Sequence, residues 1–484
     1  MPLTTLPKKL LRHTAVRILI QLAVEQGTHV YLVGGAVRDL LRGKALADID
    51  VVVTGISYKK LGAFLSKHGT VNAVGDFGTI KFLANGEHSP IDIALPRTER
   101  SAEPGSRTGF RVRFDETLPI EEDLGRRDFT INAMALDLIS KKLIDPFEGQ
   151  KDIAERIIQT VGDPTERFSE DYTRMLRAIR FTCELDATIA TDTRKALKTL
   201  SLKLSERVIP KEMIAQELTK ALVAHPSLLL ELLNETGIGK ILFPELMALH
   251  EIKEAYDGDA WSHTHLALEA TRDKKYCKIF GGPEKDPTVL WAILLHDIGK
   301  KKTRQARKVG GKTIVTFHRH AERSADLAQV IWERLQLAQG GARRTPMLAA
   351  IAHHMVLSRG ALSTITDQTL DAYFLAQPEQ GKVLKRLLLA NWEAGDPKKR
   401  AIHRKEFMTL EERLQNIERR AYKKGKPLFL ISGKEIMRDF GMQPGEQLGV
   451  LLAELRAKQL NGELTTPGDA RAFVKEKGTH HAKH

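Results

Sequence analysis

The stretch HVYLVGGAVRDLLRGKALADIDVVV, from His29 to Val53, decides the fold of this chain. Its first five residues, His29 to Val33, form an apolar run that predicts a buried strand. Gly34-Gly35 ends that strand, Ala36 to Arg42 has the pattern of a helix start, and Ile49 to Val53 predicts a second strand. A strand, a glycine turn and a helix in this order allow backbone N–H groups to approach a phosphate. A glycine pair after a strand is, however, more often only a turn.

Two carboxylates stand at the mouth of the second strand. Asp48 and Asp50 are two residues apart, so both side chains point to one face, about 7 Å apart along the backbone. Such a pair suits Mg²⁺ and a nucleoside triphosphate, although a D-x-D is more often a solvated strand edge or a helix cap. The Asp pair and the glycine turn lie within one short unit, which also contains Arg38 and Asp39, and this combination favours the metal–nucleotide site.

Length, charge and cysteine content limit the class of protein. A chain of 484 residues is expected to form about three domains. Lys and Arg number 75 against 61 Asp and Glu, and this excess favours a polyanionic partner, nucleic acid first, over a merely soluble basic protein. Cys183 and Cys277 alone predict no disulfide framework and a reducing compartment. The most apolar N-terminal run, Ile18 to Val24, is too short to span a bilayer, so we expect a cytoplasmic protein without a membrane partner.

Further elements follow along the first 140 residues. The patterns predict helices at residues 8–26 and 58–68 and strands at 79–84 and 90–95. Asp92 lies between Ile91 and Ile93 and faces opposite to them, either as a third metal-site carboxylate or as an edge-strand residue. The polar segment from Arg97 to Asp115 shows no period and predicts a long flexible loop.

Two Arg-rich segments carry donors suited to a nucleotide. Arg126 and Arg127 offer guanidinium forks for phosphate oxygens, and Asn132 suits a sugar hydroxyl. From Leu143 the chain becomes mostly helical, and there Asp171, Arg174, Arg177 and Arg180 are spaced by three. Asp171 and Arg174 together could read the Watson–Crick edge of a base. From their positions alone, an i,i+3 salt bridge is the favoured interpretation.

The second half of the chain contains several His-bearing segments. They hold His263 and His265, His296 and Asp297, His318 and His320, and His353 and His354. A single His on a helix is usually structural, but an adjacent His-Asp among several such segments has the ligand types of a mono- or dinuclear metal site.

Five motifs occur in a fixed order over the first 180 residues. They are GGAVRD at Gly34–Asp39, DID at Asp48–Asp50, IDIALPRTE at Ile91–Glu99, RRDFTINAMA at Arg126–Ala135 and EDYTRMLRAIRF at Glu170–Phe181. This set resembles the class II nucleotidyltransferases of the polymerase-β superfamily, namely the bacterial tRNA nucleotidyltransferases (CCA-adding enzymes) and their poly(A) polymerase relatives.

The resemblance implies a role for each matching residue. Gly35 and Arg38 would hold the triphosphate, and Asp48 and Asp50 would bind two Mg²⁺ ions, with Asp92 as a third catalytic acid. The nucleotide would be contacted by Arg127, Asn132, Arg177 and Arg180. Asp171 and Arg174 would select between C and A. This last role replaces the salt-bridge interpretation. The reaction implied is two-metal transfer of nucleotides from CTP and ATP to the 3′ end of tRNA.

Details of the motifs favour CCA addition over poly(A) synthesis. Asn132 is followed by Ala-Met-Ala, which resembles the tRNA enzymes, whereas the poly(A) polymerases carry bulkier aromatic residues there. The loop after Arg97–Arg100 has the length found in CCA-adding enzymes and is not shortened as in relatives that stop after CC. No Arg-rich C-terminal extension of the poly(A) polymerase kind is evident. The alternatives are a poly(A) polymerase, or a metallophosphohydrolase whose head only binds RNA.

LLHDIGKK resembles the HD-domain phosphohydrolases. That pattern maps onto His263, His296, Asp297, His320 and His354, with Asp396 as the last acid, and leaves His265 and His353 ambiguous. It implies a second divalent metal of unknown identity and an added phosphodiesterase or phosphatase activity.

The expected architecture is therefore an α/β head with a polymerase-β-like mixed sheet, followed by an all-helical body that includes an HD domain. We expect a nucleotidyltransferase head at residues 1–140, a helical nucleotide-selecting and RNA-binding neck at 141–250, the HD domain at 251–400 and a helical tRNA-binding region at 401–484.

Overall fold

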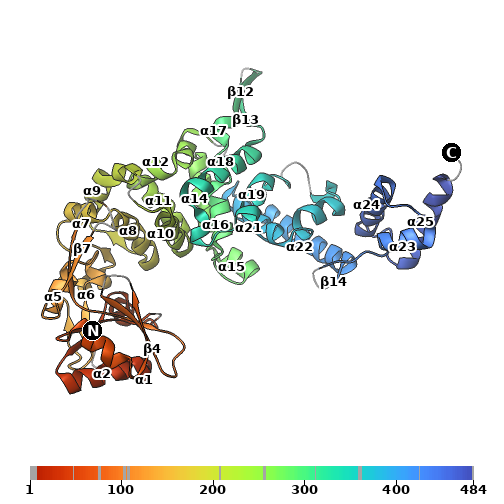
Figure 1. Cartoon of the computed structure of the whole chain (residues 1–484). Helices are drawn as coiled ribbons and strands as arrows, with labels where there is room; N and C mark the ends of the chain where they lie inside the picture. Colours follow the sequence, from red (N-terminus) through yellow and green to blue (C-terminus); the bar gives the residue numbers. More distant parts are fainter. Residues whose placement is uncertain are drawn as a thin grey trace. The chain divides into compact units, whose positions relative to one another are not determined.

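The structure is a computed structural model and describes residues 8–46, 48–74, 78–101, 105, 110–206, 209–253, 258–310, 312–357, 362–423 and 426–481. The chain divides into two compact units, Met1–Phe243 and Pro244–His484 (Figure 1). Within the described residues, no helix has the length and apolar character needed to cross a membrane.

A seven-stranded mixed sheet forms the core of the head. Its strands, in the order β3-β4-β5-β2-β1-β8-β9, are Gly69–Val74, Thr79–Ala84, Ile91–Ala94, Asp50–Thr54, His29–Val33, Ala135–Asp137 and Leu143–Ile144. Strands β2 and β5 pair in parallel and place Asp50 opposite Asp92, whereas the other pairs are antiparallel. The predicted mixed sheet is confirmed.

Helices α1 to α4 pack with this sheet and are Lys8–Arg12, Thr14–Gln26, Gly35–Leu41 and Tyr58–Leu65. On α2, Ala15, Leu19 and Leu22 recur at helical spacing and are buried in the same core as Val30 and Leu32 of β1. The helix predicted for residues 8–26 is in fact two helices, because His13 adopts an extended backbone between them.

The turn between β1 and α3 requires glycine. Gly34 has φ +65°, which favours glycine, and a Cβ atom on it would lie 2.8 Å from Nη1 of Arg127. The glycine therefore lets the guanidinium group of Arg127 pack directly against this turn.

The segment after β5 is not an aperiodic loop, and that prediction is wrong for its two arms. Strand β6, Arg97–Ser101, pairs antiparallel with β7, Phe110–Phe114. The aromatic and apolar residues Phe110, Val112 and Phe114 alternate with arginines, a period of two that favours a strand. Residues 102–104 and 106–109 of the predicted loop lie outside the described part of the chain.

The rest of the first unit is mostly helical. Helices α5 to α12 are Ile120–Gly125, Gly149–Glu155, Pro164–Glu170, Thr173–Leu185, Thr191–Leu200, Lys211–Ala224, Pro226–Glu235 and Ile238–Leu242, and short 3₁₀ helices span Thr130–Asn132 and Ser201–Glu206. Strands β10, Ile157–Ile158, and β11, Thr188–Ile189, form a small parallel pair.

The second unit is mostly helical, as predicted, but it is not all-helical, because its described residues include two strand pairs. Helices α13 to α22 are Pro244–Met247, Ala260–Ala270, Lys274–Phe280, Pro287–Leu295, Lys300–Thr303, His320–Leu335, Arg344–His353, Asp367–Leu370, Pro378–Ala394 and Arg400–Ala421, and α23 to α25 are Gly433–Phe440, Glu446–Leu460 and Pro467–His481. The helical pattern is interrupted by an antiparallel hairpin of β12, Arg304–Val309, and β13, Lys312–Phe317, and by the short pair of β14, Tyr422–Lys423, and β15, Lys426–Pro427. Helix α16 is apolar and buried along Val289–Leu295, as expected of a central helix, and the following His296-Asp297 is thereby held inside the unit.

Candidate functional sites

A cavity of about 700 Å³ lies in the first unit. Its walls are formed by Gly34, Gly35, Arg38, Asp48, Asp50, Arg97, Arg126, Arg127, Asp128, Asn132, Asp171, Thr173, Arg174, Arg177, Arg180 and Phe181. The structure therefore brings together every residue predicted to bind the nucleotide, although they come from separate segments. Among the predicted catalytic acids, Asp92 is not part of this lining.

The three predicted acids sit on adjacent elements. Asp48 is exposed ahead of β2, Asp50 begins β2, and Asp92 lies opposite on β5 with one carboxylate oxygen 2.8 Å from Nζ of Lys81. Burial raises the pKa of Asp50, and the carboxylates of Asp92 and Asp48 raise it further against the opposing charge of Arg127. A divalent cation fits this position, because it would offset both the burial and the mutual repulsion of the acids.

Arg126 and Arg127 are held by a buried acid that the sequence reasoning did not single out. Asp123 accepts from Nη2 of Arg126 at 2.6 Å and from Nη2 of Arg127 at 3.1 Å. Burial opposes ionisation of Asp123, but the two guanidinium groups lower its pKa overall. Nε of Arg127 is buried and has no hydrogen-bond partner among the described residues. Arg127 as a whole lines the cavity, so its guanidinium group suits an anionic ligand there.

Asp128 is a second missed residue and connects three of the predicted ones. Its carboxylate accepts from Nε of Arg177 at 2.7 Å and from Nδ2 of Asn132 at 3.1 Å, while Oδ1 of Asn132 accepts from Nη1 of Arg38 at 2.9 Å. Burial alone would raise the pKa of Asp128, but Arg177 and Asn132 lower it to about 2. Asp128 is part of the RRD motif, but its role could not be predicted from that motif alone, because its partner Arg177 lies 49 residues further along the chain.

Asp171 and Arg174 line the cavity, and in the described structure their side chains form no ion pair with each other, although the N–H of Arg174 donates to the carbonyl of Asp171 at 3.1 Å. Asp171 precedes α8 with an extended backbone and accepts from the N–H and hydroxyl of Thr173 at 2.8 and 2.6 Å. Arg174 instead donates to Glu170 at 2.5 Å and to the carbonyl of Arg167 at 3.0 Å. The i,i+3 salt-bridge interpretation is therefore wrong, because Asp171 lies outside the helix on which that spacing would apply.

One aromatic ring gathers three cationic side chains. The guanidinium carbons of Arg38, Arg177 and Arg180 lie 5.2, 5.3 and 4.1 Å from the ring centre of Phe181. Arg180 is also tied to Glu217, whose carboxylate accepts from its Nε at 2.6 Å. Contacts with Glu217 and cation–π contacts with Phe181 thus hold the predicted arginines in fixed positions.

Gly105 of the predicted flexible loop contacts the segment that carries Asp171. Its N–H donates to the carbonyl of Ser169 at 2.6 Å, and its own carbonyl accepts from the N–H of Tyr172 at 3.4 Å. A Cβ atom on Gly105 would lie 2.0 Å from the ring of Tyr172. The described part of this loop is therefore packed against the residue next to Asp171.

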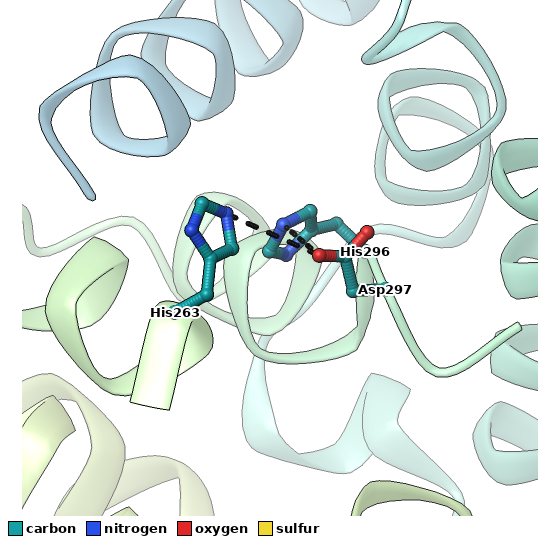
Figure 2. Close-up of side chains that lie close together, drawn as sticks. All are labelled: His263, His296 and Asp297. Carbon is teal, nitrogen blue, oxygen red and sulfur yellow. Dashed lines mark ion pairs between the residues drawn. The ribbon is translucent and has the colours of Figure 1, made fainter. Parts of the chain in front are cut away.

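The second unit contains a cluster of imidazoles around one buried aspartate. Figure 2 shows His263 of α14 beside His296 and Asp297, which follow α16. Oδ2 of Asp297 lies 3.1 Å from Nε2 of His296 and 4.0 Å from Nε2 of His263. The ligand atoms of these three residues all lie within 4.8 Å of one another.

The other oxygen of the same aspartate faces two further predicted residues. Oδ1 of Asp297 lies 3.3 Å from Nε2 of His320 and 3.7 Å from Nε2 of His354, and these three residues form a second group within 4.8 Å. The structure therefore assembles all five predicted residues of this centre from segments that are up to 91 residues apart in the sequence, His263 to His354.

The imidazoles are oriented by the backbone. Nδ1 of His296, His320 and His354 lies 2.7, 3.0 and 2.7 Å from the carbonyl oxygen three residues earlier. An Nδ1–H donated to a carbonyl leaves Nε2 as the lone-pair donor, the arrangement that metal-binding histidines use.

The protonation state of the cluster also suits a cation. Burial and the neighbouring His296 lower the pKa of His354 well below its usual value, so it is neutral. Burial opposes ionisation of Asp297, but His296 and Lys300 lower its pKa well below its usual value, so it is charged. Nε2 of His296 and Oδ2 of Asp297 are buried, and Nζ of Lys300 lies 2.7 Å from the same oxygen. A charged carboxylate among imidazoles, of which His354 is neutral, fits a divalent metal ion.

The neighbouring residues of the cluster face elsewhere. His265 stacks on Trp261 at 5.6 Å between ring centres, and His353 is exposed. Asp396 belongs to neither group, and its carboxylate accepts from the backbone N–H of Lys398 at 3.0 Å. Two residues to which the sequence patterns assign no role contact the cluster instead. They are Lys300, whose Nζ lies 2.7 Å from Asp297, and Asn391, whose Oδ1 lies 2.6 Å from Nε2 of His263.

Family models match three parts of the chain. The poly A polymerase head domain matches residues 30–159, the probable RNA and SrmB-binding site of polymerase A matches 186–249, and the HD domain matches 261–394.

Curated relatives share the name multifunctional CCA protein. That of Xanthomonas axonopodis pv. citri is 33% identical over 345 residues, which are 70% of this chain and 78% of the relative. That of Neisseria gonorrhoeae is 37% identical over 278 residues, 56% of this chain and 62% of the relative. The chain thus spans less than two thirds of the length of the Neisseria protein.

Solved structures with a similar fold extend over nearly the whole chain. The Thermotoga maritima CCA-adding enzyme, complexed with tRNA, is 22% identical with a TM-score of 0.64, and 98% of this chain and 97% of that chain are covered. The Bacillus stearothermophilus CCA-adding enzyme, in complex with CTP, is 23% identical with a TM-score of 0.57, and the coverage is 97% and 98%. At this identity the likeness establishes the fold.

Proposed function

Because this chain belongs to the family of the bacterial CCA-adding enzymes that includes the multifunctional CCA proteins, we propose that it adds CCA to the 3′ end of tRNA from CTP and ATP. The observation that carries the proposal is the single cavity lined by the glycine turn, Asp48, Asp50, Asp171 and Arg174. It combines phosphate-binding groups with an acid–arginine pair and needs no nucleic-acid template to choose a base. The proposed substrates imply a cytoplasmic location.

The triphosphate is bound by backbone and guanidinium groups that line the cavity. The backbone at Gly34-Gly35 and the donors of Arg38 and Arg127 suit phosphate oxygens. Asp48 and Asp50, with Asp92 on the adjoining strand, would hold Mg²⁺, which when bound neutralises phosphate charge and favours ionisation of the attacking hydroxyl. The 3′-hydroxyl of the tRNA then attacks the α-phosphorus in line, and pyrophosphate leaves.

The base is selected by Asp171 and Arg174. Asp171 is held by Thr173 and Arg174 by Glu170, so each presents its remaining polar atoms to the cavity in a fixed place. The carboxylate accepts from an exocyclic amine, which both C and A carry, and the guanidinium donates to ring acceptors. Arg177, Arg180 and Asn132 complete the nucleotide contacts through the network around Asp128 and Phe181.

The hairpin of β6 and β7 would change the pocket from C to A. Its residue Gly105 packs against Tyr172, so a movement of the hairpin is passed to the neighbouring Asp171. Residues 141–250 would thus select the nucleotide together with the head, and residues 401–484 would contact the tRNA backbone.

Sizing of reaction products tests the whole proposal. Purified protein is incubated with tRNA that lacks CCA and is offered CTP, ATP or both. We expect two added nucleotides with CTP and three with both. A variant that lacks Ser101–Gly109 should still add CC but lose most of the final A. A long tail with ATP alone would instead show a poly(A) polymerase, and no extension at all would leave an RNA-binding head.

A second activity is favoured by the cluster around Asp297. His263, His296, His320 and His354 would hold a divalent metal whose identity stays open, and when bound the metal would supply Lewis acidity for phosphoester hydrolysis. Lys300 neutralises charge beside Asp297 and can stabilise a substrate phosphate. Metal-dependent hydrolysis of 2′,3′-cyclic AMP by the purified protein tests this activity, and its absence with every divalent metal tried would contradict it.

A further inference from the structure

The β12–β13 hairpin stands out from the surrounding helices of the second unit (Figure 1). The segment from Lys300 to His320, which contains it, has five lysines and three arginines and no acidic residue. The chain as a whole is far more balanced, with 75 basic residues against 61 acidic ones. A segment of one sign creates a positive field that attracts polyanions.

The cations of β12 are exposed and unpaired in the described structure. Arg304, Arg307 and Lys308 are exposed, and none of them forms an ion pair with a described residue. Because side chains alternate along a strand, Arg304 and Lys308 lie on one face of the hairpin and Arg307 on the other. Lysines on a sheet edge commonly prevent unwanted strand pairing. Prevention of strand pairing needs only one or two lysines and does not explain arginines on both faces of the hairpin.

The base of the hairpin is joined directly to the His–Asp cluster. Phe317, the last residue of β13, has its carbonyl oxygen 3.0 Å from Nδ1 of His320. Lys300, which precedes β12, lies 2.7 Å from the carboxylate of Asp297 and 5.8 Å from the ring centre of Phe317. Each strand is six residues long, which corresponds to about 20 Å of extended chain. A polyanion held along the hairpin would therefore lead to the cluster.

We propose that the β12–β13 hairpin binds the phosphate backbone of RNA and thereby makes RNA ends that carry a phosphate, rather than free mononucleotides, the preferred substrates of the His–Asp centre. RNA is the polyanion that the proposed function already brings to this chain. Contacts from Arg and Lys to phosphates position RNA without reading its sequence, so the hairpin would act on many RNA ends. The substrate preference rests on the proposed hydrolytic activity, whereas the binding role does not.

The test variant replaces Arg304, Arg307 and Lys308 with Gln in the full chain. Its matched control replaces three exposed lysines of α15, Lys274, Lys275 and Lys278, with Gln, which removes the same charge from the same unit. None of these three lysines forms an ion pair among the described residues. The substrates are a tRNA that ends in a 2′,3′-cyclic phosphate and free 2′,3′-cyclic AMP.

For the hairpin variant we expect kcat/KM on the cyclic-phosphate tRNA to fall about tenfold or more, mainly through KM, because phosphate contacts are lost. Its kcat/KM on 2′,3′-cyclic AMP should stay within about twofold of the parent, and the control should keep both values. In EDTA, the dependence of log Kd for tRNA on log salt should become shallower by about two in the hairpin variant alone.

Unchanged hydrolysis of the tRNA end in the hairpin variant would overturn the proposed substrate preference, and so would equal losses in the hairpin variant and its control. If the parent protein hydrolyses neither substrate, the proposed hydrolytic function fails, and the EDTA binding measurement alone decides the hairpin. An unchanged salt dependence there would overturn RNA binding by the hairpin.

Discussion

The two candidate metal sites of this chain are built in opposite ways. In the head, Asp48 is exposed and Asp50 and Asp92 sit on neighbouring strands, and these three acids do not form a group as tight as those in the second unit. In the second unit, Asp297 and His296 are 2% and 0% exposed, and each oxygen of Asp297 faces two imidazoles.

This difference indicates where each site obtains its missing ligands. Mg²⁺ usually keeps several water molecules and binds through one or two carboxylates together with substrate phosphates. The head therefore needs the triphosphate to complete its site. The His–Asp cluster offers five protein ligand groups in advance, so the fold itself completes that site.

The largest effect is expected for Asp50→Asn. The change keeps the shape of the side chain but removes the charge that would hold Mg²⁺, so nucleotide addition should fall by about three orders of magnitude or more. Binding of tRNA, measured by fluorescence anisotropy, should persist. Lys81→Met serves as the control, because an exposed ion pair such as Lys81–Asp92 contributes little. Near-normal addition by Asp50→Asn would refute the role of this acid.

The next effect concerns the second site. The variant His296→Ala with Asp297→Ala should lose hydrolysis of 2′,3′-cyclic AMP by at least about a hundredfold, because the central carboxylate and one imidazole are removed. CCA addition should remain, which also shows that the variant is folded. The neighbouring substitution His353→Ala should leave hydrolysis nearly intact, since His353 is exposed. Joint loss of both activities in a folded double variant would show that the two sites are not independent.

A smaller effect is expected for Asp171→Ala. Loss of one hydrogen-bonding group for the base should raise misincorporation from mixed nucleotides roughly tenfold, since such contacts discriminate by about 1–3 kcal/mol. The same change also removes the acceptor for the N–H of Thr173, the first residue of α8, and should cost about 1 kcal/mol of stability. Thr173→Val loses the hydroxyl contact but keeps the carboxylate, so it separates the two effects. Reduced stability with parental fidelity in Asp171→Ala would leave Asp171 only a structural role at the start of α8.

The smallest effect is on the acid stability of the head. Asp128 has its pKa lowered to about 2 in the folded protein by Arg177 and Asn132, against the effect of burial. A lowered pKa stabilises the fold fully above the unfolded value of 3.8, and this contribution, about 2 kcal/mol, is lost as the pH falls towards 2. Asp128→Asn should therefore unfold at lower denaturant concentration at pH 6 and lose less stability between pH 5 and pH 3 than the parent. Parallel stability curves for the two proteins would contradict this role.

Local patterns were sufficient for much of the head. The apolar runs predicted β1 at His29–Val33 and β4 at Thr79–Ala84 with their observed bounds, because both strands are short, β-branched and bounded by turns. Helix ends were less accurate, as at α4, which ends at Leu65 and not at His68. Capping and tertiary contacts determine where a helix ends, and the spacing of apolar residues alone does not predict that position.

The errors at the candidate sites came from contacts between distant residues. Strands β6 and β7 pair with each other although residues 102–109 separate them in the sequence, and the spacing of Asp171 suggests a helix that in fact begins only at Thr173. The role of Asp128 depends on Arg177, and that of Asn391 on His263, 128 residues away. Between His353 and His354, only the direction of each side chain distinguishes them, and packing of α19 determines that direction.

Counting bound Mn²⁺ with and without CTP tests most directly whether the fold completes one site and the substrate the other. Equilibrium dialysis of the full chain, without tRNA, should show tightly bound Mn²⁺ that the His296→Ala, Asp297→Ala variant loses. Addition of CTP should then add further Mn²⁺ that the Asp50→Asn variant loses. Tight Mn²⁺ binding that depends on Asp50 without CTP, or no binding that depends on His296 and Asp297, would contradict the account.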